Sequence, residues 1–75
     1  MTKNEKILFD LLKEKGFNAK VVYYYPTFGY LYGGWIATVI GQDEDGHEFD
    51  CEYHLGNDFI EAKGQIENNE ITKIE

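Results

Sequence analysis

The spacing of apolar residues separates a helical opening from a strand-rich remainder. In residues 2–16, apolar side chains recur at helical intervals and share one face: Ile7, Leu8, Leu11 and Leu12. Thr2 and Glu5 have the spacing of a capping box, and Gly16 provides the left-handed residue on which many helices end. This pattern predicts one amphipathic N-terminal helix that buries a single stripe.

Residues 18–25 follow with the β-branched and aromatic content of a strand. Strict alternation assigns one face to Ala19, Val21, Tyr23 and Tyr25. It assigns the other face to Lys20, Val22 and Tyr24. Pro26 ends the strand because it offers no donor to the hydrogen-bond ladder.

Two further strands are predicted on either side of a tight turn. Residues 33–41 are apolar on both faces, which is typical of a central strand covered on both sides. The Asp45-Gly46 step favours a hairpin turn. Residues 47–55 then alternate, with one face made of Phe49, Cys51, Tyr53 and Leu55. The opposite face is made of Glu48, Asp50, Glu52 and His54.

The last third of the chain is less regular. We interpret residues 58–67 as a fourth strand weakened by Gly64, with a short helix as the alternative, and we read Asn68-Asn69 as a hairpin that leads into a short strand in 70–75. The expected fold is α+β: one N-terminal helix packed on an antiparallel meander sheet of four to five strands. Residues 1–75 form a single domain, since no linker or repeat interrupts them.

The net charge of −7 is concentrated in the C-terminal half. Residues 1–20 carry five lysines against three acids, whereas residues 41–75 carry eleven acids against two lysines. Nucleic-acid binders normally present a basic stripe to the phosphates, and this chain has the opposite sign and no arginine. Direct binding to nucleic acid is therefore not expected.

Composition also bears on the compartment. No apolar run approaches the ~18 residues of a membrane span, so no membrane association is expected. The single Cys51 fits a reducing compartment, and we expect a cytoplasmic protein. All basic residues are lysine, and residues with AT-rich codons (Lys, Asn, Ile, Tyr and Phe) are frequent, which favours a low-GC bacterium or one of its phages or mobile elements.

Candidate catalytic and metal sites are weak. His47, Cys51 and His54 have ligand side chains, but on a strand the first two stand ~13 Å apart and the third faces the other way. Two acids flank Cys51 and oppose a thiolate nucleophile. The DEDG turn resembles only part of a calcium loop. We therefore predict no metal, no cofactor and no enzymatic activity.

The leading hypothesis is a small acidic protein-binding module, in which an aromatic hairpin anchors the partner and an acidic strand face steers it. Its partner would be another protein with a basic groove, so that the module acts as an inhibitor or decoy of a nucleic-acid-binding protein. The alternative is a small-ligand or glycan binder that uses exposed tyrosines as a stacking platform. A homodimer through an edge strand is also compatible with the pattern. The candidate binding residues are Tyr24, Phe28, Tyr30, Tyr32, Asp43, Glu44, Asp45, Glu48, Asp50 and Glu52.

Overall fold

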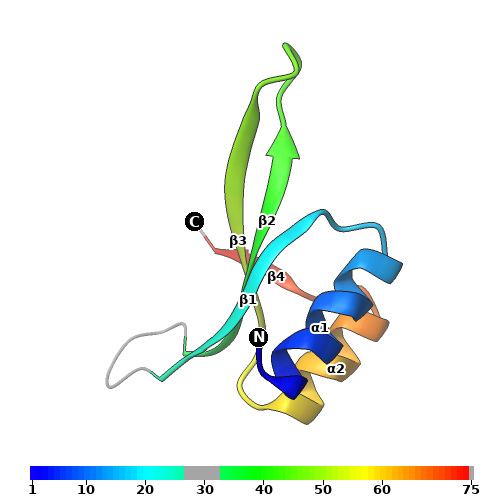
Figure 1. The fold of residues 1–75 in the computed structure, drawn as a ribbon, viewed down its shortest axis with the longest axis vertical. Helices are drawn as coiled ribbons and strands as arrows, with labels where there is room; N and C mark the ends of the chain where they lie inside the picture. Colours follow the sequence, from blue (N-terminus) through cyan, green and yellow to red (C-terminus); the bar gives the residue numbers. More distant parts are fainter. Residues whose placement is uncertain (27–32, 75) are drawn as a thin grey trace.

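Two helices lie on one face of a four-stranded antiparallel sheet in the computed structural model, which describes residues 1–26 and 33–74 (Figure 1). The elements follow the chain in this order: α1 (Lys3–Glu14), β1 (Ala19–Tyr25), β2 (Gly34–Gln42), β3 (Glu48–Gly56), α2 (Phe59–Glu67) and β4 (Thr72–Ile74). The strands lie in the sheet in the order β1-β2-β3-β4, each antiparallel to its neighbours. The expected α+β class and the meander sheet are confirmed, with four strands in the described residues.

The first helix forms as its sequence predicts. The Thr2 side chain accepts a hydrogen bond from the Glu5 N–H, and the Glu5 carboxylate accepts one from the Thr2 N–H, which completes the capping box. At the other end Gly16 has a φ of 93°. The Phe17 N–H then reaches the carbonyl of Leu12 at 2.9 Å, the backbone geometry of a Schellman motif.

One feature of β1 departs from strict alternation. Ala19 pairs with Val39 and Val21 pairs with Thr38, so Lys20 forms a bulge with no partner in the ladder. The bulge moves Ala19 to the opposite face from Val21, and the prediction that these two share a face was therefore wrong. From Val21 onward the expected alternation is confirmed.

The prediction of a fourth strand at residues 58–67 was wrong, because this segment is the helix α2. The Asp58 side chain caps it by accepting from the Glu61 N–H at 2.8 Å. Asn69 has a φ of 58° and closes the helix, with the Glu70 N–H bonded to the Gln65 carbonyl at 2.8 Å. The Asn68-Asn69 pair thus ends a helix and does not form a hairpin.

The core lies between the helices and one face of the sheet. Its fully buried side chains include Leu8 and Leu12 of α1, Leu55 of β3 and Ile66 of α2. Phe17 and Tyr53 meet edge to face at its margin, with ring centroids 5.8 Å apart. Both helices cover this single face and leave the other face of the sheet uncovered (Figure 1).

Candidate functional site: the open face of the sheet

The face of the sheet turned away from the helices forms a continuous surface, which we call the open face. Val22 and Ala37 belong to the core under the helices, so the residues that alternate with them point the other way. The register places the following side chains on the open face: Val21, Tyr23, Tyr25, Ile36, Thr38, Ile40, Glu48, Asp50, Glu52, His54, Thr72 and Ile74. All four strands therefore contribute to it.

The centre of the open face is apolar. Ile36 is only 3% exposed although it does not belong to the core under the helices. Its partners in register are Tyr23 and His54, one on each side. Around it, Val21 and Tyr25 remain 41% and 49% exposed. Such grouped apolar exposure on a small domain marks an interaction surface more often than isolated exposed residues do.

Tyr23 is fixed within this face by Glu52. Burial raises the pKa of the Tyr23 phenol above its usual 10.0, and the Glu52 carboxylate raises it further through its negative charge and through the hydrogen bond that it accepts. This interaction connects β1 to β3 across β2. Glu52 is consequently a structural partner of the apolar centre and is not a free charge.

An acidic flank borders the apolar centre. Glu48, Asp50 and Glu52 share one face of β3, as their alternation predicts. Asp50 forms an exposed ion pair with Lys20 at 3.3 Å. In the described part of the chain, the Glu48 carboxylate makes no hydrogen bond or ion pair. The open face thus combines half-exposed apolar side chains with acidic groups. Asp50 and Glu52 have partners within the protein, and Glu48 has none among the described residues.

His54 joins the open face to the start of β2. Its Nε2 lies 2.7 Å from the Gly33 carbonyl oxygen. A carbonyl only accepts, so the imidazole donates through Nε2–H in this bond. The contact places the imidazole beside the chain that enters β2 and leaves His54 half-buried.

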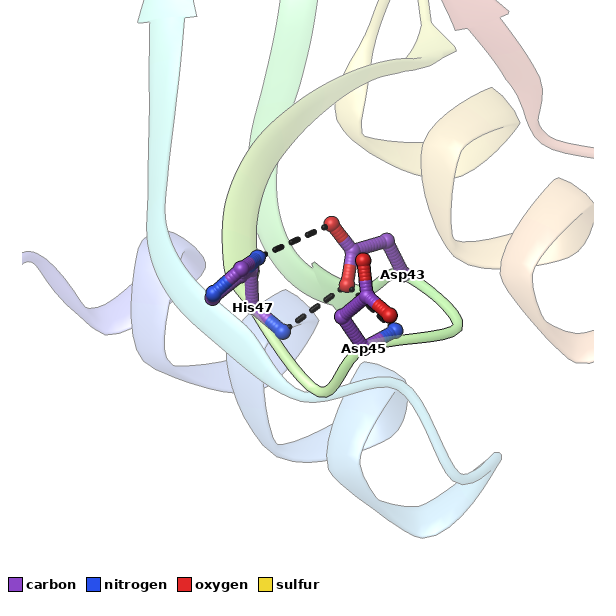
Figure 2. Close-up of side chains that lie close together, drawn as sticks. All are labelled: Asp43, Asp45 and His47. Atoms are coloured by element: carbon purple, nitrogen blue, oxygen red, sulfur yellow. Dashed lines mark hydrogen bonds and ion pairs between the residues drawn. The ribbon is translucent and has the colours of Figure 1, made fainter.

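A second group of polar side chains lies at the β2–β3 turn. Asp43 Oδ1 accepts hydrogen bonds from the backbone N–H groups of Asp45 and His47, both at 2.9 Å, and Asp43 Oδ2 lies 3.6 Å from His47 Nδ1 (Figure 2). Ligand-type atoms of the three residues fall within 4.8 Å of one another. All three residues are exposed, and the hydrogen bonds show Asp43 shaping the turn as an Asx-type cap. The turn geometry therefore accounts for the cluster.

The structure separates the sequence candidates into two groups. Asp43, Glu44 and Asp45 follow the C-terminal end of β2, whereas Tyr24 lies opposite Trp35 at the other end of that strand. Nine residues of strand span roughly 30 Å, so these groups do not form one compact patch (Figure 1). Phe28, Tyr30 and Tyr32 lie outside the described residues.

Tyr24 belongs to the helix side of the sheet. Its ring meets the Trp35 ring edge to face, with centroids 5.5 Å apart, and Trp35 in turn contacts Phe59 of α2. Tyr24 is still 52% exposed. It therefore borders the core and does not share a face with the acidic residues of β3.

The three residues considered for zinc are also dispersed. His47 lies in the exposed turn beside Asp43, and His54 lies on the open face. Cys51 pairs with Val39 and is half-buried on the helix side. Sequence reasoning missed Val21, Tyr25 and Ile36 as site residues. The sequence signal that could have identified Ile36 was the central strand in residues 33–41, which is apolar on both faces.

No protein-family model, curated protein or solved structure matches the chain. Within residues 1–26 and 33–74, no helix is both long and apolar enough to cross a membrane. Functional inference therefore depends on the geometry and chemistry of the open face.

Proposed function

We propose that the chain is a small, non-enzymatic binding module of the cytoplasm that docks another protein on its open face. The observation that carries this proposal is the pairing of an apolar centre with an acidic flank on a face that the helices leave uncovered. Half-exposed Tyr25 and Val21 supply contact area, and tyrosine is frequent among the residues that dominate interface energies.

The charge of the flank selects a partner with a basic surface. Among the described residues, no hydrogen bond or ion pair engages the carboxylates of Glu48 and of the turn residues Glu44 and Asp45. Unpaired exposed carboxylates steer association with a positive surface and reject acidic partners. A groove that normally holds phosphates has this character. The proposed role is therefore that of a decoy or inhibitor of a nucleic-acid-binding protein.

The proposal is tested by affinity capture with matched variants. The immobilised protein is exposed to a lysate of the organism that encodes it at low salt, and bound proteins are identified and then challenged with a DNA or RNA duplex. We expect the captured protein to be a nucleic-acid-binding protein that the duplex displaces. Capture should fall at least about tenfold with Tyr25→Ala or Glu48→Lys, as expected for a hot spot and for reversal of a steering charge.

Two control variants make the same chemical changes elsewhere. Ile60→Ala removes an exposed apolar side chain of α2, and Glu67→Lys reverses an exposed charge at the end of α2. Both should retain capture. If Glu67→Lys loses as much capture as Glu48→Lys does, capture depends on net charge alone, and this result would contradict the proposal. Capture that depends on Tyr25 but is unchanged by salt and by Glu48→Lys would instead favour an uncharged ligand such as a glycan.

A further inference from the structure

The outer edge of β1 offers hydrogen-bonding groups that no described residue uses. The Ile40 N–H donates to the Asn18 carbonyl on the β1 side of the sheet. The backbone N–H and C=O groups of Ile40, and of the alternate residues Thr38, Ile36 and Gly34, therefore point toward β1. The backbone groups of their partners on β1, which are Val21, Tyr23 and Tyr25, point toward β2. By the same alternation the backbone N–H and C=O groups of Val22 and Tyr24 point outward, where residues 1–26 and 33–74 supply no further strand.

The features that usually protect an edge strand lie only at the two ends of this edge, as the bulge at Lys20 and as Pro26. Residues 21–25 contain no charge and no proline, and they follow the bulge at Lys20 in regular register. The opposite edge is different: β4 is three residues long and carries Lys73, and the part of β3 beyond it carries Glu48 and Asp50. Short strands and charges discourage pairing with another chain, whereas a long, uncharged edge promotes it.

We propose that β1 pairs antiparallel with β1 of a second copy of this chain, about a two-fold axis that passes beside Tyr23. In this register Val22 faces Tyr24 of the second copy, and the outward groups of both residues form the paired hydrogen bonds of an antiparallel ladder. The two sheets become one continuous sheet.

The side chains and charges of β1 are self-complementary in this register. On the open face Val21 lies opposite Tyr25 of the second copy, and the two Tyr23 residues face each other, so aromatic and β-branched side chains are paired. Lys20 lies opposite Pro26 of the second copy, which avoids like charges in direct opposition. The acids of the β2–β3 hairpin lie on the far side of each sheet, away from the axis.

Other registers use the edge less well. A shift of two residues in either direction would bring in Pro26, which has no N–H, or Lys20, which lies in the bulge. Pairing of β1 with the β3 edge would meet only the short stretch that β4 leaves uncovered and would produce an open chain of copies. The two-fold pairing is closed and uses both outward residues.

Hydrogen exchange and mass measurement on the wild-type protein test the proposal directly. Sedimentation equilibrium over a range of concentrations should show a monomer–dimer equilibrium. As dimer forms, the amides of Val22 and Tyr24 should slow by about tenfold or more, because they become buried in a ladder. The outward amides of Glu48 and Asp50 are the internal control and should not change. A monomer at all concentrations, a mass beyond the dimer, or equal slowing of the control amides would overturn the proposal.

A disulfide trap tests the register. In a Cys51→Ala background, Tyr23→Cys places two thiols opposite each other at a non-hydrogen-bonded pair with Cα atoms ~4.5 Å apart, which is within disulfide range. Tyr25→Cys is the matched control, since two copies of residue 25 would stand ~13 Å apart. Mild oxidation should link the Tyr23→Cys protein into dimers and leave the Tyr25→Cys protein unlinked. Equal linking of both variants would contradict this register.

Discussion

Gly16 and Gly34 both have left-handed backbone conformations, but their surroundings differ. Gly16 has a φ of 93° and open space where a side chain would begin. Gly34 has a φ of 106° at the start of β2, and a Cβ there would overlap the Gly56 carbonyl oxygen and lie 2.8 Å from Asn57 Cα. Gly34 thus allows the end of β3 to approach β2 backbone to backbone.

Alanine at these two positions separates conformational strain from steric overlap. Gly16→Ala should cost about 1 kcal/mol of unfolding free energy, from the left-handed conformation alone. Gly34→Ala should cost about 3 kcal/mol, because the overlap with neighbouring backbone adds to that strain. Urea unfolding of both variants measures the difference. Equal costs would mean that the β2–β3 backbones can separate freely at this point.

The Tyr23 phenol gives the molecule a pH dependence in the alkaline range. Its pKa in the folded protein is raised by burial and by Glu52, so the folded state favours the protonated phenol more than the unfolded state does. This contribution is complete below the unfolded pKa of about 10.0 and is lost as the pH rises through the folded pKa. Stability should therefore fall above about pH 10.

Replacement of Glu52 isolates the cause of that shift. Glu52→Gln removes the negative charge beside the phenol, so the pKa of Tyr23 should move down toward its usual value while the part due to burial remains. Absorbance titration of tyrosinate in the variant and in wild type measures the change, with Tyr23→Phe identifying the relevant titration step. An unchanged titration in Glu52→Gln would show that the two side chains do not interact in solution.

At the scale of elements, α2 shows where sequence patterns succeed and where they fail. The capping box and the apolar stripe of α1 were readable from residues 2–16, and so was the alternation in β3. For residues 58–67, Gly64 suggested a weakened strand, although it occupies a helix position where a Cβ would meet nothing within 4 Å. The Asp58 cap and the helical spacing of Ala62 and Ile66 were signals that the strand interpretation did not use.

The candidate site was predictable only in part for a related reason. Alternation alone placed Glu48, Asp50 and Glu52 on one face of a strand. It could not reveal that both helices cover the opposite face, because this depends on long-range packing of α2 against β3. The bulge at Lys20 was equally hidden, since its position depends on register with β2.

Two isoleucines of α2 test how that helix contributes to stability. Ile66 is fully buried and Ile60 is 82% exposed, although both are on the same helix. Ile66→Ala should cost about 2–5 kcal/mol through lost burial and the cavity left behind. Ile60→Ala should stay within about 0.5 kcal/mol of wild type. Urea unfolding checks both, and a substantial cost at Ile60 would place that side chain in an interface.

At the scale of the whole molecule, positive and negative charges lie in different parts of the sequence and of the fold. The lysines of residues 1–20 lie on α1, at its C-cap and at the start of β1, while the turn acids lie beyond the end of β2. The β2–β3 hairpin extends away from the helices (Figure 1). The excess negative charge is therefore exposed to solvent and responsive to salt.

Screening of this charge should stabilise the fold. Raising ionic strength toward about 0.5 M should increase the unfolding free energy, because repulsion among acids is stronger in the compact state than in the unfolded chain. Glu44→Lys should itself change stability by no more than about 0.5 kcal/mol and should reduce the dependence on salt. Thermal unfolding across a salt series measures both effects. A fall in stability with salt would indicate that attractive pairs such as Lys20–Asp50 outweigh the repulsion.

The bulge in β1 leaves Lys20 without a partner residue on β2. Ala19 and Val21 pair with consecutive residues of β2, so the ladder is complete without the residue between them. Removing Lys20 altogether would join two residues that already point to opposite faces, and every later side chain of β1 would keep its side of the sheet. The loss would be confined to the exposed pair with Asp50. At this one position, a shorter chain preserves the alternation of side chains along β1.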